Sequence, residues 1–419
     1  MLAVDPLLSG GIGLAEVLIV VGKTVITFAL LLVAVMFMIW FERKLISDMQ
    51  NRIGPNKAGP WGLLQTLADG IKLFFKEDLI PDRSDRAVFI LAPFLSLVPA
   101  FVTFAVVPIG GGFDGDHDGV VRIFGHDTYL QLVDPPIGVL LILAMSSIAV
   151  YGIMLAGWSS GSKYPLLGAV RASAQMVSYE AALGVATVAV VMMTGALSTH
   201  EIVIQQAGDG YDLFGRLPLP HWNLIVTGVV PFVIFLIAGT AELNRPPFDL
   251  VEAEQELVGG FNTEYSSIRF AFFYLAEFMN TVTMSAIVVT LFLGGPAGPV
   301  FGGPAWLWGV AWFVAKLFIF LFTFVWMRAT LPRFRYDQLM NLGWKVLIPL
   351  ALAWVLLLAA INIGRDEDWN AGVVVAVCFG VLVAGWLAIT AALRQGQARR
   401  QEEDVYASST TGPREGANV

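Results

Sequence analysis

Nine long apolar runs are the feature that most limits how this chain can fold. Each is close to the ~20 residues that an α-helix needs to cross the ~30 Å hydrocarbon core of a bilayer. The chain is 57% hydrophobic and 14% charged, whereas soluble domains are about a quarter charged. The runs are residues 14–41, 87–108, 132–157, 165–194, 223–242, 268–293, 304–327, 345–363 and 371–393. We therefore predict an all-α polytopic membrane protein with about nine transmembrane helices.

The basic residues between these runs gather on one side of the predicted membrane. Of the 25 Lys and Arg residues, only Arg122, Arg216 and Arg365 fall on the other side, and Lys23 and Lys316 lie inside runs. The positive-inside rule makes the basic side cytoplasmic, so the N-terminus is expected outside and the C-terminus inside. Residues 1–393 are predicted to be a single transmembrane domain. Residues 394–419 are polar without an apolar face, which favours a disordered cytoplasmic tail.

Several residue types argue against a cofactor bound by this chain. Cys378 is the single cysteine, so a disulfide, a cysteine zinc site and an iron–sulfur cluster are excluded. The four histidines fall in loops on the outer side, where none can ligate a haem between the spans. The start of a calcium loop at Asp114, Asp116 and Asp118 has Gly125 where the bidentate Glu belongs, so an exposed loop is favoured. No phosphate-binding glycine motif is present.

The first segment after a span, residues 42–78, is long and charged. It turns at two Gly-Pro pairs and then has the apolar spacing of an amphipathic helix from about Trp61 to Lys76. Such a helix lies in the headgroup plane and does not cross the bilayer. A membrane-surface anchor and a functional loop are both compatible with this pattern.

Residues 241–265, AELNRPPFDLVEAEQELVGGFNTEY, place six acids and one base, Arg245, between two apolar runs. The Pro-Pro pair should end the preceding helix just after Glu242. Glu252 and Glu256 are four residues apart, and like charges at that spacing destabilise an isolated helix. A solvated acidic loop is the simpler interpretation. A set of proton-holding carboxylates that faces a polar cavity is the alternative.

Ionisable residues inside spans are costly and are therefore candidate sites. The ones farthest from the ends of the predicted spans are Glu180, Glu277, Lys23 and Lys316. The sixth span also carries a narrow polar stripe, made of Tyr274, Glu277, Thr281 and Ser285. Such a stripe can equally bond a neighbouring helix, but a carboxylate is harder to explain in that way because a helix partner needs no charge.

Five motifs together resemble one family. They are ERKLISDMQNRIGPNKAGPWGLLQTLADGIKLFFKED, KYPLLGAVRASAQMVSYE, AELNRPPFDLVEAEQELVGGFNTEY, YLAEFMN and PRFRYDQLMNLGWK. They look like the membrane-arm heel subunit of respiratory complex I, the proton-pumping NADH:quinone oxidoreductase. The likeness runs from about residue 15 to residue 360. It implies a place in the bacterial plasma membrane, with quinone as substrate and with FMN and iron–sulfur clusters on partner subunits.

The resemblance also implies partners and residue roles. The partners would be the peripheral quinone-module subunits, the antiporter-like and small membrane-arm subunits, and lipids, without nucleic acid. The quinone tunnel would include Glu42, Arg43, Arg52, Asp69, Lys72, Phe74 and Arg245. Proton coupling would involve Glu180, Glu242, Glu252, Glu254, Glu256 and Glu277. No catalytic acid is expected from this chain, because the direct partners of the quinone head belong to a peripheral subunit.

The predicted number of spans departs from the family, and two other functions are alternatives to the quinone enzyme. The family core has eight spans, so residues 371–393 are expected to form an added ninth helix without changed chemistry. A cation or proton transporter working alone would explain the intramembrane acids but not the charged cytoplasmic segments. The membrane component of an energy-converting hydrogenase shares the fold without a quinone, and the full-length 42–78 segment favours the quinone enzyme.

Overall fold

The computed structural model describes residues 5–8, 13–113, 118–208, 211–213, 217–219, 221–250 and 258–367, and positions 373, 376, 377 and 380. It divides into two compact units, Met1–Leu352 and Ala353–Val419. The first unit contains every described helix before α13. Almost all of the predicted ninth span and the whole predicted tail lie outside the described residues.

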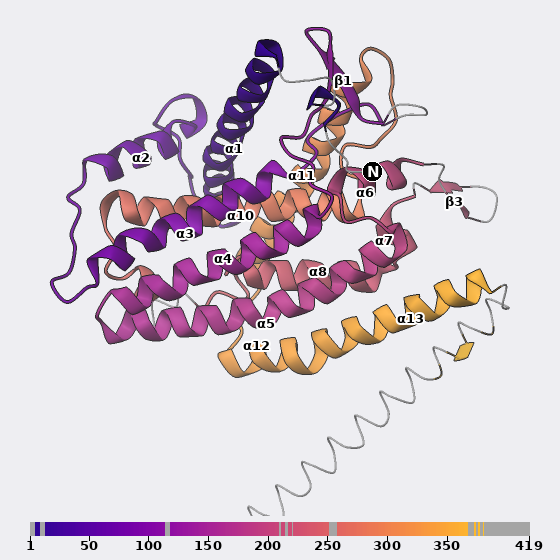
Figure 1. Ribbon diagram of the computed structural model, residues 1–419. Coiled ribbons are helices and arrows are strands. Elements are labelled where there is room, and N and C mark those ends of the chain that lie inside the picture. Colours follow the sequence, from indigo (N-terminus) through magenta and orange to yellow (C-terminus); the bar gives the residue numbers. More distant parts are fainter. Residues whose placement is uncertain are drawn as a thin grey trace, which may run out of the picture. The chain divides into compact units, whose positions relative to one another are not determined.

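Helices dominate the described chain (Figure 1). The helices are α1 (Leu14–Met49), α2 (Gln65–Phe75), α3 (Arg86–Ala105), α4 (Gly138–Ser159), α5 (Lys163–Thr194), α6 (Thr199–Ala207), α7 (Asn223–Val226), α8 (Val229–Glu242), α10 (Ser267–Phe292), α11 (Ala305–Thr330), α12 (Tyr336–Leu342) and α13 (Ile348–Asp366). Short turns are η1 (Pro6–Leu8), η2 (Pro60–Gly62), η3 (Gly260–Asn262) and the π-helical η4 (Gly343–Leu347). Two antiparallel hairpins pair β1 (Val120–Ile123) with β2 (His126–Tyr129), and β3 (Tyr211–Leu213) with β4 (Leu217–Leu219).

Seven helical stretches of the described chain are long and apolar enough to cross a membrane: α1, α3, α4, α5, α10, α11 and the continuous stretch Tyr336–Gly364. Helix α8 is apolar but has only 14 residues. It is shorter than the predicted span 223–242 because Gly228, at φ 81°, separates it from α7, where Thr227 donates back to Asn223 O. The prediction of an all-α polytopic membrane protein is confirmed.

Helix α10 lies at the centre of the first unit. It contacts α1, α3, α8 and α11, and α3, α4 and α5 lie side by side next to it (Figure 1). Most of its side chains from Phe278 onward are buried. Helix α1, in contrast, exposes large apolar side chains such as Leu18, Val25 and Ile26. Lipid tails are as apolar as leucine, so such a face suits the outside of a membrane bundle.

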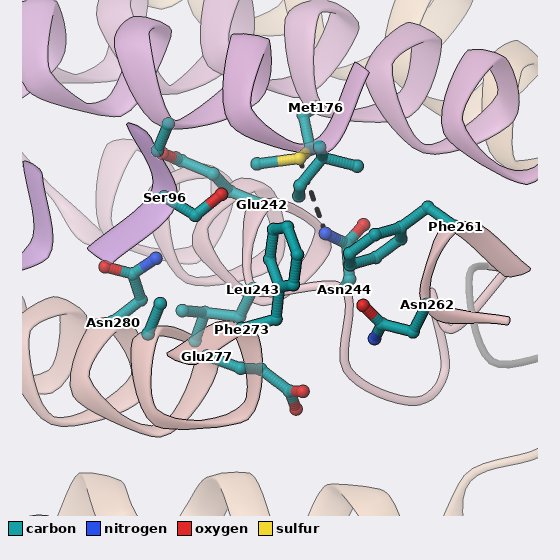
Figure 2. A pocket seen from close by; sticks show the side chains of 13 residues that line it. Ser96, Met176, Glu242, Leu243, Asn244, Phe261, Asn262, Phe273, Glu277 and Asn280 are labelled. Carbon is teal, nitrogen blue, oxygen red and sulfur yellow. Dashed lines mark hydrogen bonds between the residues drawn. The ribbon is translucent and has the colours of Figure 1, made fainter. Parts of the chain in front are cut away.

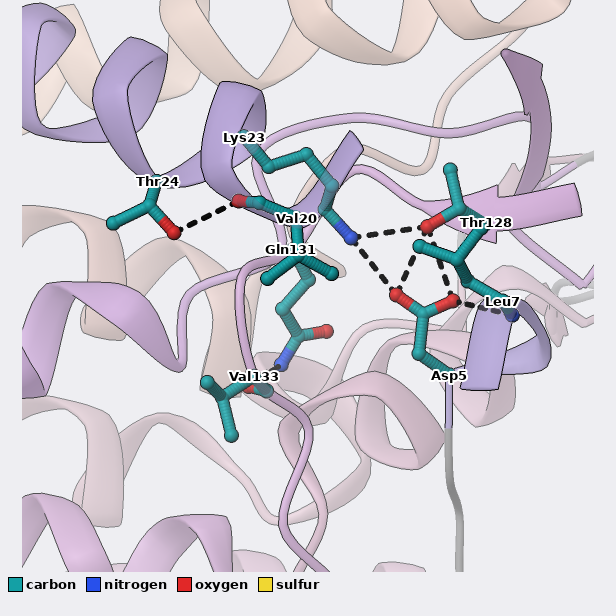
Figure 3. Close-up of polar contacts among 8 residues, drawn as sticks. All are labelled: Asp5, Leu7, Val20, Lys23, Thr24, Thr128, Gln131 and Val133. Carbon is teal, nitrogen blue, oxygen red and sulfur yellow. Dashed lines mark hydrogen bonds and ion pairs between the residues drawn. The ribbon is translucent and has the colours of Figure 1, made fainter. Parts of the chain in front are cut away.

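Lys23, one of the two lysines inside predicted spans, forms hydrogen bonds with both the N-terminal segment and the β1–β2 hairpin (Figure 3). Its Nζ donates to Asp5 Oδ2 at 2.8 Å and to Thr128 Oγ1 at 3.0 Å. Thr128, which is fully buried on β2, donates in turn to Asp5. This charge is therefore compensated by protein groups.

Lys316 has an equally complete set of partners. Its three ammonium protons match three carbonyl oxygens at the C-terminal end of α10: Leu293 at 2.7 Å, Gly295 at 2.9 Å and Ala297 at 2.8 Å. A cation at a helix C-terminus is favoured by the helix dipole. Lys316 thus caps the end of α10 and holds the following turn.

Candidate functional site

A buried arginine, Arg245, lies between two acids that come from different helices. Its side chain is 2% exposed, and Nη1 donates to Glu42 Oε2 at 2.8 Å. Its Nε lies 3.7 Å from Oε1 of Glu277, and its guanidinium carbon is 4.6 Å from the ring centre of Phe278. Glu42 also pairs with Arg328 of α11. The two guanidiniums and two carboxylates compensate one another, which buried charges require.

The local chain path explains how Arg245 reaches the interior. Helix α8 ends at Glu242, and Asn244 adopts φ 52°, a left-handed conformation that Asn tolerates better than most residues. Gln175 of α5 holds this turn. Its amide donates to Ala241 O at 2.7 Å, to Asn244 Oδ1 at 3.1 Å and to Phe248 O at 2.8 Å. Glu42 meets Arg245 because α1 continues to Met49, beyond the predicted end at 41.

An open cleft of about 470 Å³ lies on one side of this cluster. Its charged lining consists of Glu42, Arg43, Arg52 and Arg328, and Tyr274 of α10 also faces it. Apolar groups such as Ile46 and Ile53 complete the wall. A cleft that combines a few charges with apolar walls is suited to a ligand with a polar head and an apolar tail.

Helix α2 is tied to the cleft through Asp69, which accepts hydrogen bonds from Arg43 at 2.7 Å and from Gln65 at 3.1 Å. Burial acts to raise the pKa of the Asp69 carboxyl, but these bonds and the charges of Arg43 and Lys72 outweigh it, so the pKa lies below its usual value. Lys72 and Phe74 lie on α2 as well, and Phe74 is 70% exposed.

A smaller and more enclosed cavity of about 60 Å³ is lined by Glu277, the second acid that contacts Arg245 (Figure 2). Its polar lining consists of Ser96, Glu242, Asn244, Asn262, Glu277 and Asn280. A second cavity of about 50 Å³ shares Glu242 and Asn280 with the first and adds Thr103, Ser146 and Thr283. Glu242 accepts a hydrogen bond from Ser146, and the next residue of α4, Ser147, donates to Glu180.

The structure therefore brings most of the predicted site residues into one connected region. Glu42, Arg43, Arg52, Asp69 and Arg245 lie at or next to the cleft, Glu242 and Glu277 line the enclosed cavity, and Glu180 follows through Ser147. Glu252, Glu254 and Glu256 lie outside the described residues. Among the described residues, no group of three His, Cys, Asp or Glu side chains is placed to hold a metal ion.

The four residues of the polar stripe of α10 do not share one role. Thr281 Oγ1 donates to Glu277 O at 3.0 Å, and Ser285 Oγ donates to Thr281 O at 2.8 Å. These hydroxyls satisfy carbonyls of their own helix, which is common for Ser and Thr in buried helices. A bond to a neighbouring helix, one of the two alternatives for the stripe, and a cavity contact are both unnecessary to explain these hydroxyls.

Three groups of the site were missed by sequence reasoning. Asn280 follows Glu277 by three residues, a spacing that places both on one helix face and could have indicated it. Arg328 lies one residue beyond the predicted span 304–327, so the sequence indicates only a basic residue of the following loop. Ser146 and Ser147 carry no signal in the sequence, because an isolated Ser-Ser pair in a span is unremarkable.

Comparisons with known proteins identify the family. The model of the NADH dehydrogenase family matches residues 22–359. The H subunit of the NADH-quinone oxidoreductase of Streptomyces avermitilis is 50% identical over 372 residues, which cover 87% of this chain and 78% of that protein. The H subunits of Frankia casuarinae (51% over 390 residues, 91% and 80%) and Frankia alni (50% over 409 residues, 96% and 84%) are similar to the same degree. The chain therefore belongs to the NADH dehydrogenase family, together with these H subunits of NADH-quinone oxidoreductase.

Proposed function

We propose that this chain is the membrane subunit of a bacterial NADH-quinone oxidoreductase that encloses much of the quinone-access tunnel, anchors the peripheral arm and couples quinone reduction to proton pumping. The names of its relatives support membership of that complex. In this proposal the cleft and α2 face the cytoplasm, the N-terminus is outside and the C-terminus is inside. FMN and iron–sulfur clusters on partner subunits supply the electrons, and this chain supplies no redox centre.

The observation that carries the proposal is that Arg245 contacts one acid of the cleft and one acid of the enclosed cavity. Glu42 belongs to the cleft and Glu277 to the cavity, and one guanidinium contacts both. Negative charge or a proton that arrives in the cleft changes how strongly Glu42 holds Arg245. At an effective dielectric constant near 20, two unit charges 4 Å apart interact by about 4 kcal/mol. A change of that size is enough to alter the charge balance at Glu277.

From Glu277, a proton path can continue to Glu242 and then to Glu180. The enclosed cavity joins Glu277 to Glu242, and Oε2 of Glu242 is buried without a hydrogen-bond partner among the described residues. Glu242 and Glu180 then bond consecutive serines of α4. Carboxylates exchange protons readily with water and with each other. In this proposal Glu252, Glu254 and Glu256 belong to the cytoplasmic approach to the path.

The variant Glu277→Gln tests this function in the assembled complex. It keeps the size and removes the exchangeable acid, so we expect NADH:quinone turnover and proton pumping in vesicles to fall at least about tenfold. NADH oxidation by an artificial acceptor that reacts at the flavin subunit should stay normal, which reports assembly. Glu201→Gln, at an exposed position of α6, is the matched control. Normal turnover and pumping in Glu277→Gln would contradict the proposal.

Purification distinguishes the competing functions. Co-purification of flavin and iron–sulfur subunits with quinone reductase activity supports the proposal. Proton or cation transport by the isolated chain would favour a transporter, and co-purification with a hydrogenase module would favour the hydrogenase relative.

A further inference from the structure

We propose that Asn280 is a positioning residue that holds one water of the chain through which a proton passes between Glu277 and Glu242. This inference rests on the proposed function, because it concerns the same proton path. Asn280 lies on α10, three residues after Glu277, and lines both the 60 Å³ and the 50 Å³ cavities. Glu242 also lines both, whereas Glu277 lines only the first. Asn280 and Glu242 are thus the two polar residues that the linings of both cavities share.

Unsatisfied polar atoms indicate that these cavities are wet. Glu242 Oε2, Ser96 Oγ and Thr283 Oγ1 are buried without a hydrogen-bond partner among the described residues. All three residues line one or both cavities. Burial of a polar group without a partner is unfavourable, and bound water removes that cost. One water needs about 10–15 Å³ of such space, so each cavity has room for several.

The amide of Asn280 is free to bind such water. Among the described residues it has no protein hydrogen-bond partner, unlike its neighbour Thr281, whose hydroxyl donates to Glu277 O. Figure 2 shows Asn280 and Glu277 on one helix, with Ser96 and Glu242 across the cavity. An amide donates through its NH₂ and accepts through its carbonyl oxygen, so it can orient a water molecule in either sense.

The proton step itself is balanced. The carboxyl of Glu277 gives its proton to the first water of a hydrogen-bonded chain, each water passes one of its own protons to the next, and the last water gives one to the carboxylate of Glu242. Asn280 gains and loses nothing. Its role is to orient one water of this chain, because each proton transfer needs heavy atoms within about 2.6–3.2 Å.

The decisive variant is Asn280→Leu in the assembled complex, since leucine has a similar size but cannot bind water. We expect kcat for NADH:quinone turnover to fall at least about tenfold, equivalent to about 1.4 kcal/mol in the barrier, with the KM for quinone unchanged. Asn280→Ser keeps a donor and an acceptor and leaves space for a further water, so it should retain most of the turnover. Thr281→Val, the adjacent buried residue whose hydroxyl bonds only its own helix, is the matched control.

Each outcome of these measurements either supports or overturns the role of Asn280. Parent-like turnover and pumping in Asn280→Leu overturns the inference, and so does an equal loss in Asn280→Leu and Asn280→Ser, which would mean that shape alone matters. A raised KM for quinone would assign Asn280 to tunnel packing and also overturn it. If Glu277→Gln is slow while Asn280→Leu is normal, only this inference fails. If Glu277→Gln and Glu242→Gln are both normal, the proposed proton path fails as well.

Discussion

Replacing Arg245 by methionine should loosen the whole site. Methionine fills similar space but removes one of the two guanidiniums at Glu42 and the guanidinium that lies 3.7 Å from Glu277. The side chains of Arg245 and Glu42 are only 2% and 7% exposed, so solvent cannot replace the lost partner. Removing one member of a buried ion pair costs about 3–5 kcal/mol. Local opening around the turn after α8 should therefore become easier by that amount.

Hydrogen–deuterium exchange on the purified complex measures this opening. A loss of about 3 kcal/mol or more accelerates amide exchange roughly 100-fold or more, since about 1.4 kcal/mol is a factor of ten. Peptides that cover Glu42 and Arg245 should show the change together. Arg122→Met removes the partner of Asp127 at a pair whose side chains are 75% and 58% exposed, and it should cost about 1 kcal/mol or less.

A double-mutant cycle completes the test. Glu42→Gln combined with Arg245→Met should destabilise by less than the sum of the single changes, with a coupling of about 1.5 kcal/mol or more. Additive effects, or an acceleration below tenfold in Arg245→Met, would show that the buried pair does not hold the site together.

Two further predictions concern other parts of the chain. Lys316→Met leaves three carbonyls at the end of α10 without their donor, so the complex should inactivate at a lower temperature, by a loss of about 1–3 kcal/mol, while turnover at low temperature is unchanged. The pKa of Asp69 is depressed in the folded state, so its pair with Arg43 stabilises α2 at neutral pH and is lost as the pH falls below about 4. Asp69→Asn should accelerate exchange in α2 less than tenfold at pH 7, because the pair is partly exposed, and the difference from the parent should vanish in acid.

The helices could be predicted well because apolar length is a local property of the sequence. Each of the first eight predicted spans corresponds to a helix of the described chain, with changed ends where local chemistry intervenes. The predicted span 132–157 begins later, at Gly138, after the prolines at 135 and 136, and the predicted span 223–242 is divided at Gly228. Both hairpins were missed because their strands have only three or four residues each.

The site was predictable as a set of residues but not as an arrangement. Burial cost alone identified Glu180 and Glu277 as candidates. The pairing of Glu42 with Arg245 joins residues 203 positions apart, and no spacing rule reaches that far. Thr281 bonds a carbonyl of its own helix, whereas Asn280 lines the cavity. Which residue does which depends on the face of α10 that meets α3 and α8. That choice is made by packing across the whole bundle.

The long sequence separations within the Glu42 cluster also bear on how the protein is made. Glu42 emerges from the ribosome before Arg245, 203 residues later, and before Arg328, 286 residues later. At roughly 5–20 residues per second, the first partner arrives about 10–40 s after Glu42. During that time the carboxylate must stay hydrated at the membrane surface or take up a proton. The C-terminal end of α1 can therefore take its final position only late in synthesis, when Arg245 in the turn after α8 has been made.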